Sequence, residues 1–231
     1  MLTPIEMDAL LLSLKVSGFA MLWALPLAIF VAHILANKNF MGKIFLEGLV
    51  YAPLVLPPVI VGYLLLLTLN PVSGFGFWLQ DTMGITLAFS WGGAALAAGI
   101  MAFPLMVRAI RMGFESQDTR LVDAARTLGA STTRAFFTIS LPLAFPGLLA
   151  GLLLGFARAL GEFGATITFV SNIPGVTQTL PLALFNATQS PQSPLGDDAA
   201  FTLMIISLII AFSALIASEL ILRRHKKRSA V

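Results

Sequence analysis

The sequence predicts an all-α integral membrane protein with about five transmembrane helices, and three observations lead to this class. First, 58% of the 231 residues are hydrophobic and only 11% are charged, whereas a soluble domain carries about 25% charged residues. Second, the charged residues leave five densely apolar windows, each long enough to supply the roughly 20 residues that cross a bilayer core. Third, the basic residues gather in alternate gaps between these windows.

The five apolar windows lie at about 11–35, 45–69, 85–110, 136–160 and 200–222. Residues 163–196 are also uncharged, but this stretch is rich in Thr, Ser, Asn, Gln and Pro. We therefore expect a polar outer loop at 164–199, either without a further membrane segment or with a sixth, partial or re-entrant one at 165–190. The chain is predicted to form one transmembrane domain over residues 1–231, with its core at about 10–222.

The basic residues predict the orientation of the chain. Lys38 and Lys43 follow the first window, five arginines lie at the end of the third window or between it and the fourth, and five basic residues follow the fifth. The gaps at 70–84 and 164–199 contain neither Lys nor Arg. Because basic loops stay in the cytoplasm, the N-terminus is expected outside and the C-terminus in the cytoplasm. A full sixth span would place the C-terminal basic cluster outside, against the rule.

Prolines and glycines mark special positions within the windows. Prolines at 57 and 58, at 104, and at 142 and 146 interrupt helical hydrogen bonding, which predicts either plain kinks or a moving gate. Gly147, Gly151, Gly155 and Ala159 recur at every fourth residue. This spacing lets another helix approach closely, either within the chain or at a seam between two copies.

The loop at 112–135, between the third and fourth windows, predicts a short cytoplasmic helix. Asp118 is a suitable N-cap, and Gly129 stands where a left-handed helix end is favoured. Ser131 or Thr132 can start the next helix. An apolar stripe at i, i+3, i+4 and i+7 runs along this helix, and it consists of Leu121, Ala124, Ala125 and Leu128. A projecting helix with such a stripe is expected to dock into a partner.

The same loop resembles the EAA loop of ABC importer permeases, whose pattern is E-A-A-x3-G-x9-I-x-L-P. The match runs through Asp123-Ala124-Ala125, Gly129, Ile139 and Leu141-Pro142, and Asp123 replaces Glu while keeping the carboxylate. The resemblance implies a coupling helix that sits in a cleft of a cytoplasmic ATPase. Stripe and motif together give nine candidate ATPase-coupling residues: Leu121, Asp123, Ala124, Ala125, Leu128, Gly129, Ile139, Leu141 and Pro142.

A second resemblance concerns the substrate. Residues 157–175 are similar to the matching segment of molybdate permeases, and sulfate/thiosulfate permeases share the first half; residues 54–63 and 103–111 extend the likeness. It implies a type I ABC importer fold in the inner membrane and translocation of molybdate by alternating access. It also implies a homodimer of permeases, two copies of an ATPase subunit that bind ATP and Mg²⁺, and an extracytoplasmic molybdate-binding protein. Sulfate/thiosulfate and tungstate remain alternative substrates.

Six residues near the outer end of the fourth window are candidates for the translocation pathway or its gate. Arg158 and Glu162 are four residues apart and share one helix face, so they either hold the outer gate or form a plain structural ion pair. Neutral donors suit an oxyanion that must pass without binding tightly, although a polar outer loop would contain them as well. These donors are Thr166, Thr168, Ser171 and Asn172.

Other classes of function fit the sequence less well. No G-x-x-x-x-G-K-[ST] loop occurs, so ATP is expected on a separate chain and no cofactor on this one. A membrane-embedded enzyme would need a cluster of catalytic side chains at one depth, and none stands out. The chain has no cysteine, which excludes thiolate metal sites, and His33 and His225 are too far apart to suggest a metal site. The basic residues lie in short clusters between apolar runs, which argues against a nucleic-acid partner.

Overall fold

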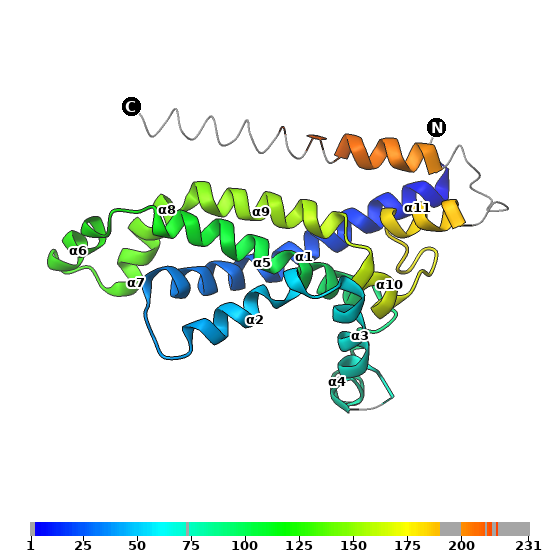
Figure 1. The fold of residues 1–231 in the computed structure, drawn as a ribbon, viewed down its shortest axis with the longest axis horizontal. Coiled ribbons are helices and arrows are strands. Elements are labelled where there is room, and N and C mark those ends of the chain that lie inside the picture. Colours follow the sequence, from blue (N-terminus) through cyan, green and yellow to red (C-terminus); the bar gives the residue numbers. More distant parts are fainter. Residues whose placement is uncertain (1–2, 73, 190–199, 211, 214–215, 217–231) are drawn as a thin grey trace.

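The computed structural model describes residues 3–72, 74–189, 200–210, 212–213 and 216, and these residues form helices and connecting turns without a strand. Three helices, α1 (Pro4–Asn37), α5 (Trp91–Glu115) and α9 (Phe145–Leu160), lie side by side and form the body of the bundle (Figure 1). Their contact surfaces are built from small side chains, with Ala24 and Ala28 of α1 and Ala98 and Ala102 of α5 fully buried. Small residues at such interfaces allow close packing of membrane helices.

The glycine stripe of α9 packs inside the chain. A Cβ atom added to Gly147 would lie 2.7 Å from the Cα atom of Gly113 in α5, and one added to Gly151 would lie 2.7 Å from Cγ1 of Ile110. Gly155 faces Met106 of α5 in the same way. The prediction of close helix approach is confirmed, and the partner helix of this stripe is α5 of the same chain.

Two of the predicted spans are bent. The second consists of α2 (Lys43–Val55) and α3 (Pro58–Leu69), which meet at an angle of 112°. The bend follows from Pro57 and Pro58, because proline has no N–H to donate and cannot continue the hydrogen-bond ladder. Beyond it, α3 and α4 (Gly74–Met83) extend to one side of the bundle (Figure 1).

The fourth span is built from several short pieces before it becomes regular. These pieces are α7 (Thr132–Ala135), the wide turn η1 (Phe136–Ser140) and α8 (Leu141–Leu143). Together they are bent by 68° relative to α9, near the prolines at 142 and 146. By contrast, Pro104 lies within α5, which continues through it without a break.

Among the described residues, these helices supply two to four of the five predicted spans. By length and composition, α1 and α5 can each cross a membrane, and the two bent pairs raise the number to four among the described residues. The fifth window begins with a short apolar helix, Ala200–Ile210, and its remainder lies mostly outside the described residues. The predicted polar stretch at 164–199 contains α10 (Gly164–Val170) and α11 (Leu180–Gln189).

Candidate functional site

The loop that follows α5 contains α6 (Thr119–Thr127), a short helix capped at both ends. The Asp118 side chain accepts a hydrogen bond from the backbone N–H of Arg120 at 3.0 Å. Gly129 has φ +89°, its N–H donates to the carbonyl of Arg126, and the N–H of Ala130 donates to the carbonyl of Ala125. This pair of bonds is a Schellman motif, which satisfies the last carbonyls of a helix. The predicted cap and left-handed glycine are confirmed.

The outer surface of α6 is apolar and uncovered. None of its nine residues is buried by the part of the chain that the structure describes. Leu121 is 49% exposed, Leu128 directly after the helix is 89% exposed, and Ala124 between them is exposed as well, while Ala125 is partly covered. Figure 1 shows α6 at the end of the bundle opposite the N-terminus. An apolar stripe on a projecting helix is typical of a surface that binds a partner.

The opposite side of α6 faces the end of α1 across a recess of about 240 Å³. Asp123 and Arg126 of α6 line this recess, together with His33 of α1 and Phe136. The His33 ring makes edge contacts with Phe136 and with Phe114, at centroid distances of 4.6 and 5.1 Å. Asp123 therefore lies on the face of α6 that points toward the membrane domain, opposite the apolar stripe.

Polar contacts connect this loop to the start of the fourth span. The Gln117 side chain donates from Nε2 to the carbonyl of Ser140 at 2.8 Å, and Ser131 caps α7 by accepting from the N–H of Arg134. The remaining motif residues belong to that span, because Ile139 lies in η1 and Leu141 and Pro142 lie in α8. The motif thus joins an exposed helix to a bent membrane segment.

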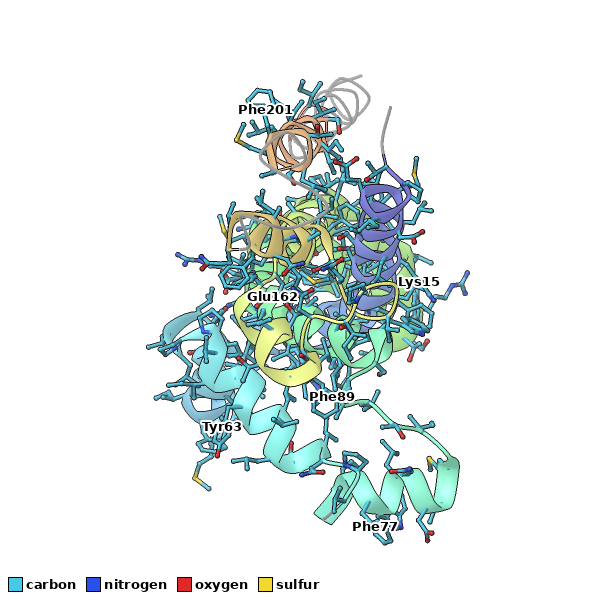
Figure 2. The ribbon with its side chains drawn as sticks, turned by 90° about the vertical axis from the view of Figure 1, so that its right-hand side faces the viewer. Lys15, Tyr63, Phe77, Phe89, Glu162 and Phe201 are labelled. Atoms are coloured by element: carbon cyan, nitrogen blue, oxygen red, sulfur yellow. The ribbon has the colours of Figure 1, made fainter. Side chains whose placement is uncertain are left out.

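At the other end of the bundle, Arg158 and Glu162 form an ion pair. The distance from Nη1 of Arg158 to Oε2 of Glu162 is 2.6 Å, and the Glu162 side chain is almost completely buried. The other carboxylate oxygen of Glu162 accepts from the N–H of Ala165 at 2.7 Å, in the first turn of α10. Figure 2 shows Glu162 within the bundle, whereas Phe77 of α4 lies at its far edge. The pair therefore fixes the junction between α9 and α10.

Three of the four predicted neutral donors of this region, Thr166, Thr168 and Asn172, make local side-chain hydrogen bonds. Thr166, which is buried, donates to the carbonyl of Phe163 at 2.8 Å, and Thr168 donates to that of Gly164 at 2.9 Å. The Asn172 side chain donates to the carbonyl of Leu182 and accepts from Gln178. Bonds of this kind to carbonyls three or four residues back allow a hydroxyl to be buried within a helix. These donors therefore stabilise the outer segment in this conformation.

Ser171 has a strained backbone, with φ +63° and ψ −166°. This region of conformational space costs a residue other than glycine about 1–3 kcal/mol, and such strain concentrates at clamps and switch segments. The carbonyl of Ser171 accepts a hydrogen bond from the Thr177 hydroxyl at 3.2 Å, and Thr177 is fully buried. Three more polar residues of this segment, Thr177, Gln178 and Thr179, are buried. They were not among the residues that the sequence predicted for the site.

One further polar cluster was missed by the sequence reasoning. Arg111 of α5 pairs with Glu115 of the same helix and with Glu47 of α2. The spacing of four between Arg111 and Glu115 was a usable signal, whereas nothing local in the sequence connects position 47 to position 111. Among the described residues, no group of three or more His, Cys, Asp or Glu side chains is arranged to hold a metal ion.

A family model described as "binding-protein-dependent transport system inner membrane component" matches residues 24–228. The chain belongs to this family. Two relatives are similar to this inner membrane component over nearly its whole length. The molybdenum transport system permease protein ModB of Escherichia coli (strain K12) is 53% identical over 228 residues, 99% of this chain and 98% of the relative. The ModB protein of Haemophilus influenzae is 51% identical over 223 residues, 96% of each chain.

A solved structure shares the fold of this transport-system component. It is a bacterial alginate ABC transporter in complex with an alginate pentasaccharide-bound periplasmic protein, with a TM-score of 0.76 over 97% of this chain and 81% of that chain. The two sequences are 17% identical, so this likeness concerns the fold alone. The predicted fold of a type I ABC transporter permease is confirmed, and the matched family is an inner membrane component of transport systems.

Proposed function

We propose that this chain is the permease subunit of an ATP-driven importer that carries molybdate into the cytoplasm. The observation that carries the transport mechanism is the exposed apolar face of α6, which a partner must cover. The identity of 51–53% with molybdenum transport permeases over nearly the full length supports molybdate as the substrate. ATP and Mg²⁺ are bound by the partner ATPase, into which α6 docks.

The proposed assembly has two copies of the permease, two ATPase subunits and one extracytoplasmic molybdate-binding protein. The apolar stripe of α6 is the ATPase-facing surface, and its two leucines, Leu121 and Leu128, are both exposed. The solved alginate transporter, which has this fold, was crystallised with a periplasmic protein. This precedent supports docking of a binding protein at the outer end of the bundle.

The proposed topology has five spans, with the N-terminus outside and the C-terminus in the cytoplasm. In Figure 1, α6 lies at one end of the bundle, and the N-terminus, α10 and α11 lie toward the other. The α6 end also contains Lys38, Lys43 and the arginines of the coupling loop. Because basic residues favour the cytoplasmic side, this arrangement supports the proposed orientation.

In the proposed cycle, ATP binding draws the two coupling helices together and hydrolysis lets them separate. The motion passes from α6 through Gln117 and Ser140 to the bent fourth span. At the outer end, Arg158 and Glu162 hold α10 in its buried position. Movement of α9 would then shift α10 and open or close the outer side of the pathway.

Metal uptake in cells that lack their own molybdate permease tests this proposal. The chain is expressed with its own ATPase and binding protein, and molybdenum is measured by elemental analysis with and without excess sulfate. We expect ATPase-dependent accumulation that resists sulfate. Uptake that sulfate abolishes would assign the chain to sulfate/thiosulfate transport. No molybdenum uptake by the assembled complex would refute molybdate as the substrate.

A matched pair of variants tests the docking role of α6 in the same cells. Leu128→Asp places a charge in the apolar stripe and is expected to abolish uptake. Met41→Asp changes another fully exposed apolar residue, in the turn between α1 and α2, and is expected to leave uptake intact. Equal loss from both variants at normal expression would contradict a specific docking surface on α6.

A further inference from the structure

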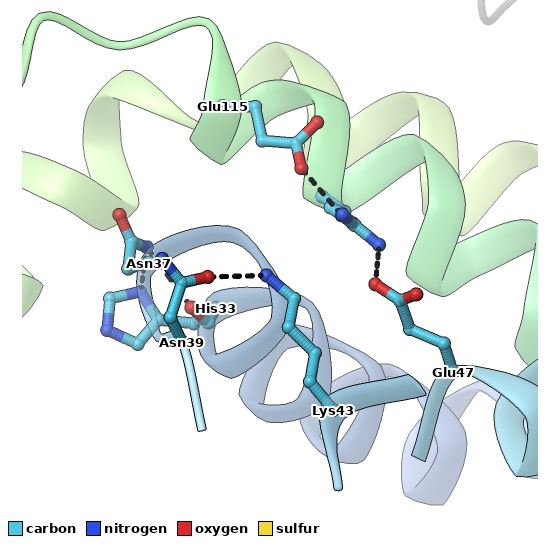
Figure 3. A network of polar contacts seen from close by, with 7 residues as sticks. His33, Asn37, Asn39, Lys43, Glu47 and Glu115 are labelled. Carbon is cyan, nitrogen blue, oxygen red and sulfur yellow. Dashed lines mark hydrogen bonds and ion pairs between the residues drawn. The ribbon is translucent and has the colours of Figure 1, made fainter. Parts of the chain in front are cut away.

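A single arginine connects the two helices at the cytoplasmic end of the bundle. The guanidinium of Arg111 in α5 donates from Nη1 to Oε1 of Glu47 in α2 at 2.7 Å, and from Nε to Oε1 of Glu115 at 2.6 Å (Figure 3). All three side chains are partly exposed, between 24% and 44%. Glu115 lies four residues after Arg111 on the same helix, so it orients the guanidinium. Glu47 is the only long-range partner of Arg111 in this network among the described residues.

Helix α2 has few other attachments to the bundle. Val50 is the only buried residue among its thirteen residues, as far as the described chain extends. Glu47 and Val50 are three positions apart and therefore share one helix face. Ile44, Phe45, Leu49 and Val55 are exposed. The ion pair with Arg111 is thus a major polar attachment of α2 to the body of the bundle.

The ion pair lies next to the coupling helix α6, and through α2–α3 it is connected to α10 at the outer end of the bundle. Arg111 and Glu115 occupy the last turn of α5, directly before Asp118 begins the coupling helix α6. Beyond its bend, α2 continues as α3, which packs on α10 so closely that a side chain at Gly62 would meet the backbone of Ala165. The segment α2–α3 is therefore attached to α5 at the cytoplasmic end and to α10 at the outer end.

We propose that Arg111 is a positioning residue that makes α2–α3 follow the coupling loop, so that the contact of α3 with α10 responds to the ATPase. When α6 moves, the end of α5 moves with it, and the pair with Glu47 makes α2 move too. Without the pair, α6 still docks and ATP is still hydrolysed, but the outer segment no longer receives the full displacement. This inference rests on the proposed function of the chain as a permease driven by an ATPase.

The pair is suited to communication more than to stability. Partly exposed ion pairs contribute little to the stability of a fold. A guanidinium that contacts two carboxylates in fixed directions does, however, specify the relative position of two helices. Loss of the pair should therefore leave assembly intact and appear in the ratio of transport to hydrolysis.

Four variants of the full complex, reconstituted in proteoliposomes with the ATPase and binding protein, test this role. Arg111→Gln and Glu47→Gln remove the charge on either side. The double variant Glu47→Arg with Arg111→Glu reverses the pair, and the introduced arginine on α2 then faces two carboxylates on α5. Arg108→Gln is the matched control, since it removes an exposed arginine of α5 that has no ion pair among the described residues.

The readouts are basal ATP hydrolysis, its stimulation by the binding protein, and molybdate transported per ATP hydrolysed. We expect both single variants to keep basal hydrolysis and to lose about five- to tenfold in stimulation and in transport per ATP, a typical size for coupling between sites. The reversed pair should recover most of both, and Arg108→Gln should match the parent. Parental ratios in the single variants would overturn the proposal, as would an assembled reversed pair that recovers neither ratio.

A failure of the proposed substrate is distinguishable from a failure of this inference. If the parent complex hydrolyses ATP and responds to its binding protein but carries no molybdate, the substrate is wrong. The stimulation of hydrolysis still tests Arg111 in that case, because it does not depend on the identity of the anion. A stimulation that is equal in Arg111→Gln and in the parent would then overturn the positioning role.

Discussion

Replacing Gly129 with alanine tests whether α6 must end in a left-handed turn. Gly129 has φ +89°, and a Cβ atom added there would meet nothing within 4 Å. The cost of Gly129→Ala is therefore confined to the local backbone, where a left-handed conformation costs an L-residue roughly 1–2 kcal/mol. This energy corresponds to about a 5- to 30-fold fall in the population of the capped helix. Gly129→Asn should reduce the population of the capped helix less than Gly129→Ala does, because asparagine tolerates the left-handed conformation better than alanine.

The assay is the affinity between the ATPase and the permease in nanodiscs, measured together with ATP-driven uptake. Gly84→Ala is the matched control, since Gly84 has φ +66°, no atom within 4 Å of an added Cβ, and a position just after α4. Both variants carry a similar backbone cost, but only Gly129→Ala should weaken ATPase binding, by up to about 30-fold. Parental affinity in Gly129→Ala, or an equal loss in both variants, would refute the reasoning.

Three further variants probe the packing and the outer end of the bundle. Glu162→Ala removes the acceptor for Arg158 and for the first turn of α10. We expect it to lower the free energy of unfolding by about 3 kcal/mol. Thermal unfolding in detergent measures this loss, and Glu162→Gln should recover part of it. Gly147→Ala forces α9 away from the backbone of α5 and should lower the melting temperature, whereas Gly161→Ala, whose added Cβ has its nearest neighbour at 3.7 Å, should not. Lys15 lies 3.8 Å from the centre of the Trp91 ring, a contact worth about 0.5–1 kcal/mol. Because this contact is a small structural one, Lys15→Gln should leave the uptake rate within about twofold of the parent. A larger fall would indicate that Lys15 attracts the anion.

Local features of the coupling loop could be predicted from the sequence because their causes are local. A cap such as Asp118 or a left-handed glycine such as Gly129 acts on residues within one turn, and both are found where the sequence predicts them. The apolar windows likewise marked α1 and α5, since the length of an apolar run depends on composition alone.

Long-range features could not be predicted in the same way. The prolines at 57 and 58 indicated a break in the second span, but neither its angle of 112° nor the packing of α3 against α10 could be predicted from a local signal. The polar stretch after Gly164 suggested a surface loop, yet Thr166 is buried because its hydroxyl is satisfied by the backbone of its own helix. The pair between Glu47 and Arg111 joins positions 64 residues apart, so no sequence periodicity could identify it.

The most direct test of the central claim is a site-specific cross-link from α6 to the ATPase. Because the chain has no cysteine, Leu128→Cys gives a single attachment point for a benzophenone probe, and Leu67→Cys on α3 gives an equally apolar, exposed control. We predict that the probe at position 128 forms an adduct with the ATPase subunit and that the probe at position 67 does not. An assembled, transport-competent complex in which position 128 gives no ATPase adduct would contradict the assignment of α6 as the coupling helix.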